Sequence, residues 1–168
     1  MNNLKTIKGV GVGIYKCMKM VHSNGVNDFV YDERFHPISG ERDPGQGSPS
    51  IKEILRFIMK IDHNLHFPSE VYVTAVIYLD RVAINSSLFV SEDNWRRMLL
   101  AALLVASKFV LDYRVENVDF GFVLPSLKDI NDLEKQFLQH LHYDLYVEGS
   151  HYYLYYFSAN TMVSNFSY

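Results

Sequence analysis

The middle of the chain carries a run, residues 98–106, that is apolar on every side of a helix. A surface helix keeps one polar face, so a helix without such a face is surrounded by other protein. The run is also shorter than the roughly 18 apolar residues that a membrane-spanning helix needs. The sequence therefore predicts a buried helix at the centre of a helical bundle.

Helical patterns on both sides of this run supply the elements that would bury it. Apolar residues recur at three- and four-residue spacing, which is typical of amphipathic helices, and capping or first-turn residues mark the helix starts. The expected helices are residues 50–64, a helix opened by Pro68 and Glu70, the central helix capped by Ser91, a short helix at 119–124, a helix capped by Asp129 that runs to about Leu141, and a helix at 151–157.

We expect an all-α fold, a single bundle of about five helices. Residues 85–90 have some strand character, but they are too short and isolated to change this class. A helix over residues 6–20 is weakened by three glycines, each of which costs about 1 kcal/mol in a helix. The expected organisation is an N-terminal extension and linker at 1–50, the bundle at 51–146, and a partial extra helix or tail at 147–168.

Charge and cysteine content exclude several classes of protein. Lys and Arg number 16 against 19 Asp and Glu, whereas a nucleic-acid-binding domain normally has a basic excess. The one basic pair, Arg96 and Arg97, is expected at a solvated helix edge. The single cysteine, Cys17, excludes an intrachain disulfide and a multi-cysteine zinc site. A reducing compartment is therefore expected, with an intracellular protein in the cytoplasm, the nucleus or both.

Three ionisable residues interrupt apolar helix faces. Asp80, Lys108 and Glu134 each lie between aliphatic residues three or four positions away, on the same face of a helix. Removing one partner of a buried charge pair costs about 3–5 kcal/mol, so we expect Lys108 to meet Glu134, Asp80 or both. A structural reading is also open, because a lysine near a helix C-terminus is favoured by the dipole and keeps its ammonium in water.

Several segments together resemble a known family. Residues 95–109 read WRRMLLAALLVASKF and resemble the third helix of a cyclin box. Residues 75–81, AVIYLDR, are similar to its second helix, and residues 131–138, NDLEKQFL, to its fifth. The segments that resemble the cyclin Y branch are TIK at 6–8, YDERFHP at 31–37, VENVD at 115–119 and YYF at 155–157. The chain is thus similar to cyclin Y-like proteins, with a single cyclin box at 51–146.

The resemblance implies a regulatory subunit of a cyclin-dependent kinase of the PFTAIRE or PCTAIRE class. It implies no catalytic residue, cofactor or metal. In cyclins, the lysine of the Ala-Ser-Lys motif and a glutamate of the fifth helix bind the kinase, and these match Lys108 and Glu134. Phe109 and Leu138 match apolar contact positions of the same surface. Asp80 matches the acid that supports the lysine in many cyclins.

The chain departs from the family in three respects. The substrate-docking motif MRAIL is replaced by IKEIL at residues 51–55, so docking by that route is not expected. A second full cyclin box is not expected, because too little chain follows Leu141. The second residue is Asn2 rather than the glycine that myristoylation requires, so the membrane anchoring known in the family is not supported.

Two alternative functions are also compatible with the sequence. A cyclin fold that docks without activating, or one that binds nucleic acid in a transcription factor, are the alternatives. An enzyme is not expected, because GVGVG at residues 9–13 lacks the full spacing of a dinucleotide or phosphate loop. The histidine pairs at 63 and 66 and at 140 and 142 lack a recognisable metal-site spacing.

Overall fold

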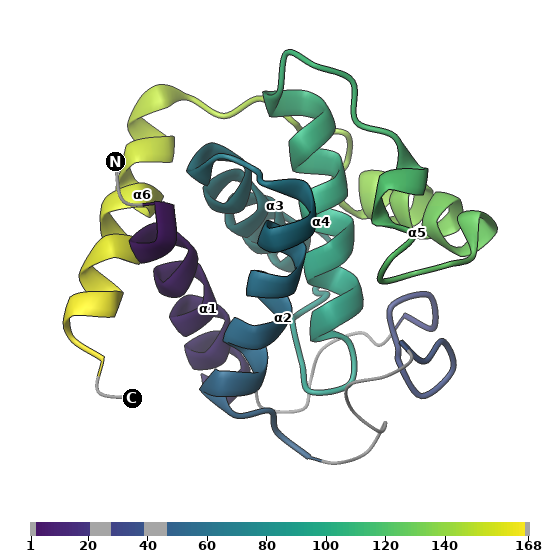
Figure 1. Cartoon of the computed structure of the whole chain (residues 1–168), viewed down its shortest axis with the longest axis horizontal. Coiled ribbons are helices and arrows are strands. Elements are labelled where there is room, and N and C mark those ends of the chain that lie inside the picture. The colour runs from purple at the N-terminus through teal and green to yellow at the C-terminus, as the bar shows by residue number, and fades with distance from the viewer. Residues whose placement is uncertain (1–2, 21–27, 39–46, 167–168) are drawn as a thin grey trace.

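A computed structural model describes residues 3–20, 28–38 and 47–166 of the chain. Within these residues the fold is all-α, as expected, with six α-helices, one short 3₁₀-helix and no strand. Figure 1 shows the helices as one bundle. The elements are α1 (Asn3–Met20), α2 (Ile51–Leu65), α3 (Ser69–Ser86), α4 (Trp95–Val110), η1 (Asn117–Phe120), α5 (Leu127–His140) and α6 (Gly149–Ser164).

The central helix of the bundle is α4. Every residue from Trp95 to Ser107 is buried. The helix packs between α3 on one side and α5 on the other (Figure 1). The prediction of a helix enclosed by protein on all sides is therefore confirmed, and the enclosed part is longer than the apolar run because it includes two arginines.

Two helix starts differ from the sequence prediction. Ser91 does not cap α4; it opens a turn, and its backbone N–H donates to Oδ1 of Asn94 at 2.7 Å, one residue before the helix. Asp129 is not the cap of α5 either, because the side chain of Ser126 accepts the backbone N–H of Asp129. Both errors arise where several cap-forming residues lie within four positions of one another.

The N-terminal helix α1 is part of the bundle and packs along α6 and against α2. Its glycines let these helices approach closely. A Cβ on Gly9 would lie 2.0 Å from the carbonyl oxygen of Ala159 in α6, and one on Gly11 would lie 2.6 Å from Leu55 in α2. The propensity cost of the glycines is thus offset by packing that other residues would prevent.

Helix α6 continues well beyond the expected residues 151–157. Its tyrosines divide between two sides. Tyr152, Tyr155 and Tyr156 pack against the core, whereas Tyr153 and Phe157 are exposed. Core packing of the tyrosine-rich end is therefore confirmed for only part of it.

Among the residues that the structure describes, no helix combines the length and apolar character needed to cross a membrane.

The expectation that Arg96 and Arg97 form a solvated edge is wrong, since both are buried at the N-terminal end of α4. Arg96 makes a bidentate contact with the buried carboxylate of Glu33, at 2.6 and 3.2 Å. Arg97 donates to both carboxylate oxygens of Asp129 in α5, at 2.9 and 2.7 Å, and to the carbonyl oxygen of Val30 at 2.7 Å. Their partners lie far away in sequence, and each buried charge is compensated as burial requires.

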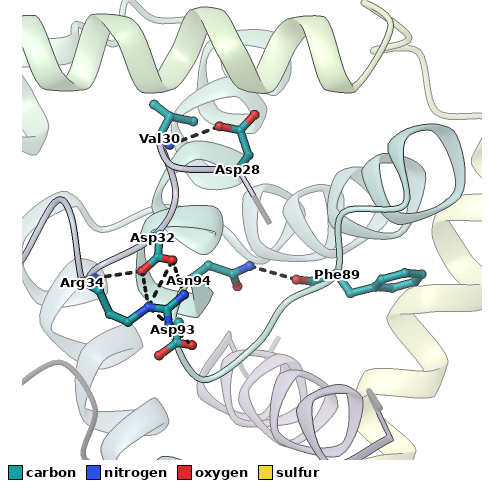
Figure 2. A network of polar contacts seen from close by, with 7 residues as sticks. All are labelled: Asp28, Val30, Asp32, Arg34, Phe89, Asp93 and Asn94. Atoms are coloured by element: carbon teal, nitrogen blue, oxygen red, sulfur yellow. Dashed lines mark hydrogen bonds and ion pairs between the residues drawn. The ribbon is translucent and has the colours of Figure 1, made fainter. Parts of the chain in front are cut away.

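The contacts of Arg96 with Glu33 and of Arg97 with Val30 attach a non-helical segment, residues 28–38, to α4. The hydroxyl of Tyr31 is hydrogen-bonded to Nδ1 of His140 at 2.9 Å, and Nε2 of the same ring lies 3.2 Å from the carboxylate of Asp28. Figure 2 shows that Asp28 also accepts the backbone N–H of Val30. The segment is therefore attached to α4 through Val30 and Glu33 and to α5 through Asp28 and Tyr31.

The close contact of α1 with α6 predicts opposite effects for two glycine substitutions. Gly9→Ala should lower the free energy of unfolding by about 2–3 kcal/mol, since the new methyl group meets backbone that cannot move aside. Gly13→Ala is the matched control, because its Cβ would lie 3.6 Å from Met162, an ordinary contact. It should leave stability unchanged or raise it by up to about 1 kcal/mol. Equal urea midpoints for the two variants would contradict this packing.

The pair of Arg97 and Asp129 predicts a loss of stability in acid. The hydrogen bonds from Arg97 hold the pKa of the Asp129 carboxyl below its ordinary value. The stabilisation is present above the pKa of the unfolded chain and is lost as the pH falls through the lower pKa of the folded protein.

We therefore expect Asp129→Asn to flatten the dependence of unfolding free energy on pH between about pH 5 and pH 2. Asp132 lies on the same helix and is half-exposed beside Lys128. Asp132→Asn should show the same dependence of unfolding free energy on pH as the wild-type protein. Urea unfolding followed by circular dichroism across this pH range measures both, and identical slopes in all three proteins would disprove the role of Asp129.

Candidate partner-binding site

Lys108 and Glu134 meet at the surface of the bundle. Lys108 lies in the last turn of α4 and Glu134 in the middle of α5, and Nζ of the lysine lies 2.6 Å from Oε2 of the glutamate. Their side chains are 35% and 20% exposed. Two of the three charges that interrupt apolar faces are thus brought together, at a place that water and another protein can reach.

Asn117, which the sequence did not indicate, joins this pair. Its Oδ1 accepts from Nζ of Lys108, and its Nδ2 donates to Oε1 of Glu134 at 3.3 Å and to Oδ1 of Asn131 at 2.6 Å. The only local signal for an ordered turn here is the spacing of Glu116 and Asp119. Those two residues form reciprocal capping bonds around η1 and fix the backbone that carries Asn117.

The arrangement leaves hydrogen-bonding capacity for a partner. An ammonium group has three donors, and Lys108 uses two of them, on Asn117 and Glu134. A carboxylate has about four lone-pair positions, and Glu134 uses one on each oxygen. The site therefore presents a free donor beside free acceptors, which matches the C=O and N–H groups of a polypeptide backbone.

Two predicted apolar residues flank the pair. Phe109 follows Lys108 and is 49% exposed, a high value for a phenylalanine. Leu138 lies one turn beyond Glu134 in α5 and is half-buried against the core. Val118, in η1 next to Asn117, is also exposed, although it was not predicted as a site residue. Exposed aromatic side chains such as Phe109 are enriched in protein-binding surfaces.

The structure does not place Asp80 beside Lys108. Its carboxylate accepts the hydroxyl of Tyr155 in α6 at 2.5 Å. Burial raises the pKa of Tyr155, and the hydrogen bond to Asp80 raises it further. The expectation that Asp80 supports the lysine is therefore corrected, and Asn117 holds that position instead. Asp80 helps to attach α6 to α3.

The histidines have structural surroundings. His140 contacts Tyr31 and Asp28, and His63 and His66 lie with ring centroids 6.3 Å apart. In the described part of the chain, no three His, Cys, Asp or Glu side chains come together in a group that would hold a metal ion.

A family model described as Cyclin matches residues 15–145 of the chain. The match covers α2 to α5 entirely and most of the described chain. It includes all four residues of the partner-binding site that the resemblance implies, Lys108, Phe109, Glu134 and Leu138.

The exposure of the pair predicts that the fold tolerates its loss. Lys108→Ala and Glu134→Ala should each change the free energy of unfolding by only about 0.2–1 kcal/mol, as is usual for exposed ion pairs. Arg96→Ala, which leaves Glu33 buried without its guanidinium, should cost about 3–5 kcal/mol. Urea unfolding of the three variants tests the contrast, and a loss of several kcal/mol at Lys108 would make this pair structural.

Proposed function

Because the chain belongs to the cyclin family, whose members are regulatory subunits of cyclin-dependent kinases and not enzymes, we propose that it binds and activates a kinase of the PFTAIRE or PCTAIRE class. The observation that carries the proposal is the meeting of Lys108 and Glu134, the two positions that match the kinase-binding residues of cyclins. The half-exposed Phe109 beside them adds the apolar area that such an interface needs.

Recognition would begin with the polar pair. Charge-assisted hydrogen bonds are shorter and stronger than neutral ones, and the free donor of Lys108 and free acceptors of Glu134 suit the backbone of a kinase helix or loop. Phe109 and Leu138 would be covered by the kinase, and burial of an aromatic anchor commonly dominates the energy of an interface. The polar pair would then set orientation, while the apolar residues supply most of the affinity.

Activation follows from differential affinity. A protein kinase is active when the glutamate of its αC helix pairs with the strand lysine and its activation loop is ordered. A subunit that binds this arrangement better than the inactive one shifts the population toward it. Moving the ratio from 1:99 to 99:1 takes about 5.5 kcal/mol of difference in binding free energy, so rigid presentation of the contact residues is essential.

The kinase class is inferred from the segments that resemble the cyclin Y branch. Two of them are integral to the fold. Residues 31–37 lie in the segment attached to Arg96 and Arg97, and residues 115–119 contain Asn117, which positions Lys108 and Glu134. The branch-like sequence therefore supports the proposed site directly.

A nucleic-acid-binding role is disfavoured by the same structure. The basic pair Arg96 and Arg97 is buried and neutralised by Glu33 and Asp129. Phosphate binding needs exposed lysines and arginines gathered on one face. A subunit that docks without activating remains the alternative, and a phosphorylation assay with purified kinase separates it from an activator.

The site predicts a loss of kinase binding in two variants. Lys108→Ala and Glu134→Ala should each weaken the affinity for a purified PFTAIRE-class kinase at least about tenfold, which corresponds to about 1.4 kcal/mol. The cause is the loss of a charge-assisted bond, with the other charge left at the covered interface. Isothermal titration calorimetry gives the affinity directly.

Lys128→Ala is the matched control, because Lys128 is an exposed lysine of α5 paired with Asp132. It should bind as tightly as the wild-type chain. If Lys108→Ala and Glu134→Ala also bind within twofold of the wild type, the site is elsewhere. If the wild type binds but does not raise kinase activity, the chain is a docking subunit and not an activator.

A further inference from the structure

Asn131 of α5 is an exposed residue in the polar network around Lys108 and Glu134. It lies at i, with Glu134 at i+3 and Leu138 at i+7, so the three side chains share one face of the helix. We propose that the side-chain amide of Asn131, oriented by Asn117, is a further kinase-contact group that donates to a backbone carbonyl oxygen of the kinase. This inference rests on the proposed function and names the chemistry of the partner at one more position of the same site.

The orientation of the Asn117 amide is fixed by its two charged neighbours. A lysine ammonium can only donate hydrogen bonds, and an ionised carboxylate can only accept them. The side-chain oxygen of Asn117 therefore faces Nζ of Lys108, and its nitrogen faces Oε1 of Glu134 at 3.3 Å. The reverse orientation would place the amide nitrogen against an ammonium and the amide oxygen against a carboxylate, so only one orientation is stable.

This orientation determines that of Asn131 in turn. Nδ2 of Asn117 donates to Oδ1 of Asn131 at 2.6 Å, and a donor of this kind requires the oxygen of the second amide. The NH₂ group of Asn131 is then the part left for a partner, because within the described residues no hydrogen bond uses it and the residue is exposed. The charge of Lys108 thus sets, through two hydrogen bonds, which polar atom of Asn131 a partner meets.

Asn117 is attached to a rigid part of the chain. Glu116 and Asp119 form reciprocal capping bonds around η1. Phe120, the last residue of η1, is fully buried, and its ring centroid lies 6.1 Å from that of Phe67. A contact group whose orientation is set before binding loses little conformational entropy in the complex, so the amide of Asn131 is prepared for a partner.

The spacing of Asn131 and Glu134 suits a polypeptide backbone. Residues at i and i+3 of a helix are neighbours, with about 5–6 Å between their Cβ atoms. The face therefore offers N–H donors beside the free acceptor positions of a carboxylate. A backbone supplies both C=O and N–H groups and can bind both side chains, whereas a carboxylate side chain of the kinase would bind only the donor. The geometry thus favours a backbone carbonyl as the acceptor for Asn131.

The test compares two variants by calorimetry with a purified PFTAIRE-class kinase. Asn131→Ala removes the donor and should weaken the affinity about three- to tenfold, the usual effect of one hydrogen bond. Asn131→Asp keeps an oxygen that accepts from Asn117 but places a carboxylate against the kinase carbonyl, so it should weaken the affinity about tenfold or more. Urea midpoints close to that of the wild type in both variants show that the fold is not the cause.

Two further substitutions separate the contact from its orientation. In the Asn117→Ala chain nothing orients Asn131, so adding Asn131→Ala should weaken binding less than it does in the wild-type chain. Asn64→Asp is the matched control, because Asn64 is an exposed asparagine whose Nδ2 donates to the carbonyl oxygen of Lys60 at 2.8 Å. It adds the same charge on α2, apart from α5 in Figure 1, and should bind as the wild type does.

The outcomes separate this inference from the proposed function. Loss of affinity in both Asn131 variants, with wild-type affinity in Asn64→Asp, supports the inference. Wild-type affinity in Asn131→Ala, tighter binding by Asn131→Asp, or an equal effect of Asn131→Ala with and without Asn117 overturns it. The proposed function survives these results if Lys108→Ala still weakens binding. If the wild-type chain does not bind the kinase, the proposed function and this inference both fail.

Discussion

The rest of the structure depends on the burial of α4 together with the two arginines of its first turn. A guanidinium group cannot be left unpaired in a protein interior, so Arg96 and Arg97 require acids from elsewhere in the chain. Glu33 and Asp129 provide them, and this places both the segment 28–38 and the start of α5 against α4. The position of α5 in turn brings Glu134 to Lys108.

The two ends of α4 use the same chemistry for different purposes. At its N-terminal end the ion pairs are buried, and breaking one destabilises the protein by several kcal/mol. At its C-terminal end Lys108 and Glu134 are partly exposed, and their pair contributes little to stability. Burial, and not residue type, therefore separates the charges that hold the fold from those that are available to a partner.

Periodicity predicted the all-α class, the enclosed central helix and the meeting of Lys108 with Glu134, Asp80 or both, because helical spacing determines which residues share a face. It failed where the deciding contact was distant in sequence. The sequence pattern around Arg96 and Arg97 predicts a solvent-exposed helix edge. Both arginines are buried because they pair with Glu33 and Asp129, which are distant in sequence. Asp80 has the right spacing to meet Lys108, but α6 lies against α3 and supplies Tyr155 instead.

The rigidity of α4 also affects whether the chain only binds a kinase or also activates it. One contact, such as that at Lys108, adapts to either conformation of a kinase and discriminates poorly between them. Two contacts on separate helices, Lys108 on α4 and Glu134 on α5, both form only when the kinase presents its own acceptor and donor at the matching separation. The conformation that fits both gains binding energy that the other cannot, and that difference is what shifts a population. Attachment of α5 to α4 through the buried pair of Arg97 and Asp129 would thus serve activation, since a loosely held Glu134 would lose this selectivity.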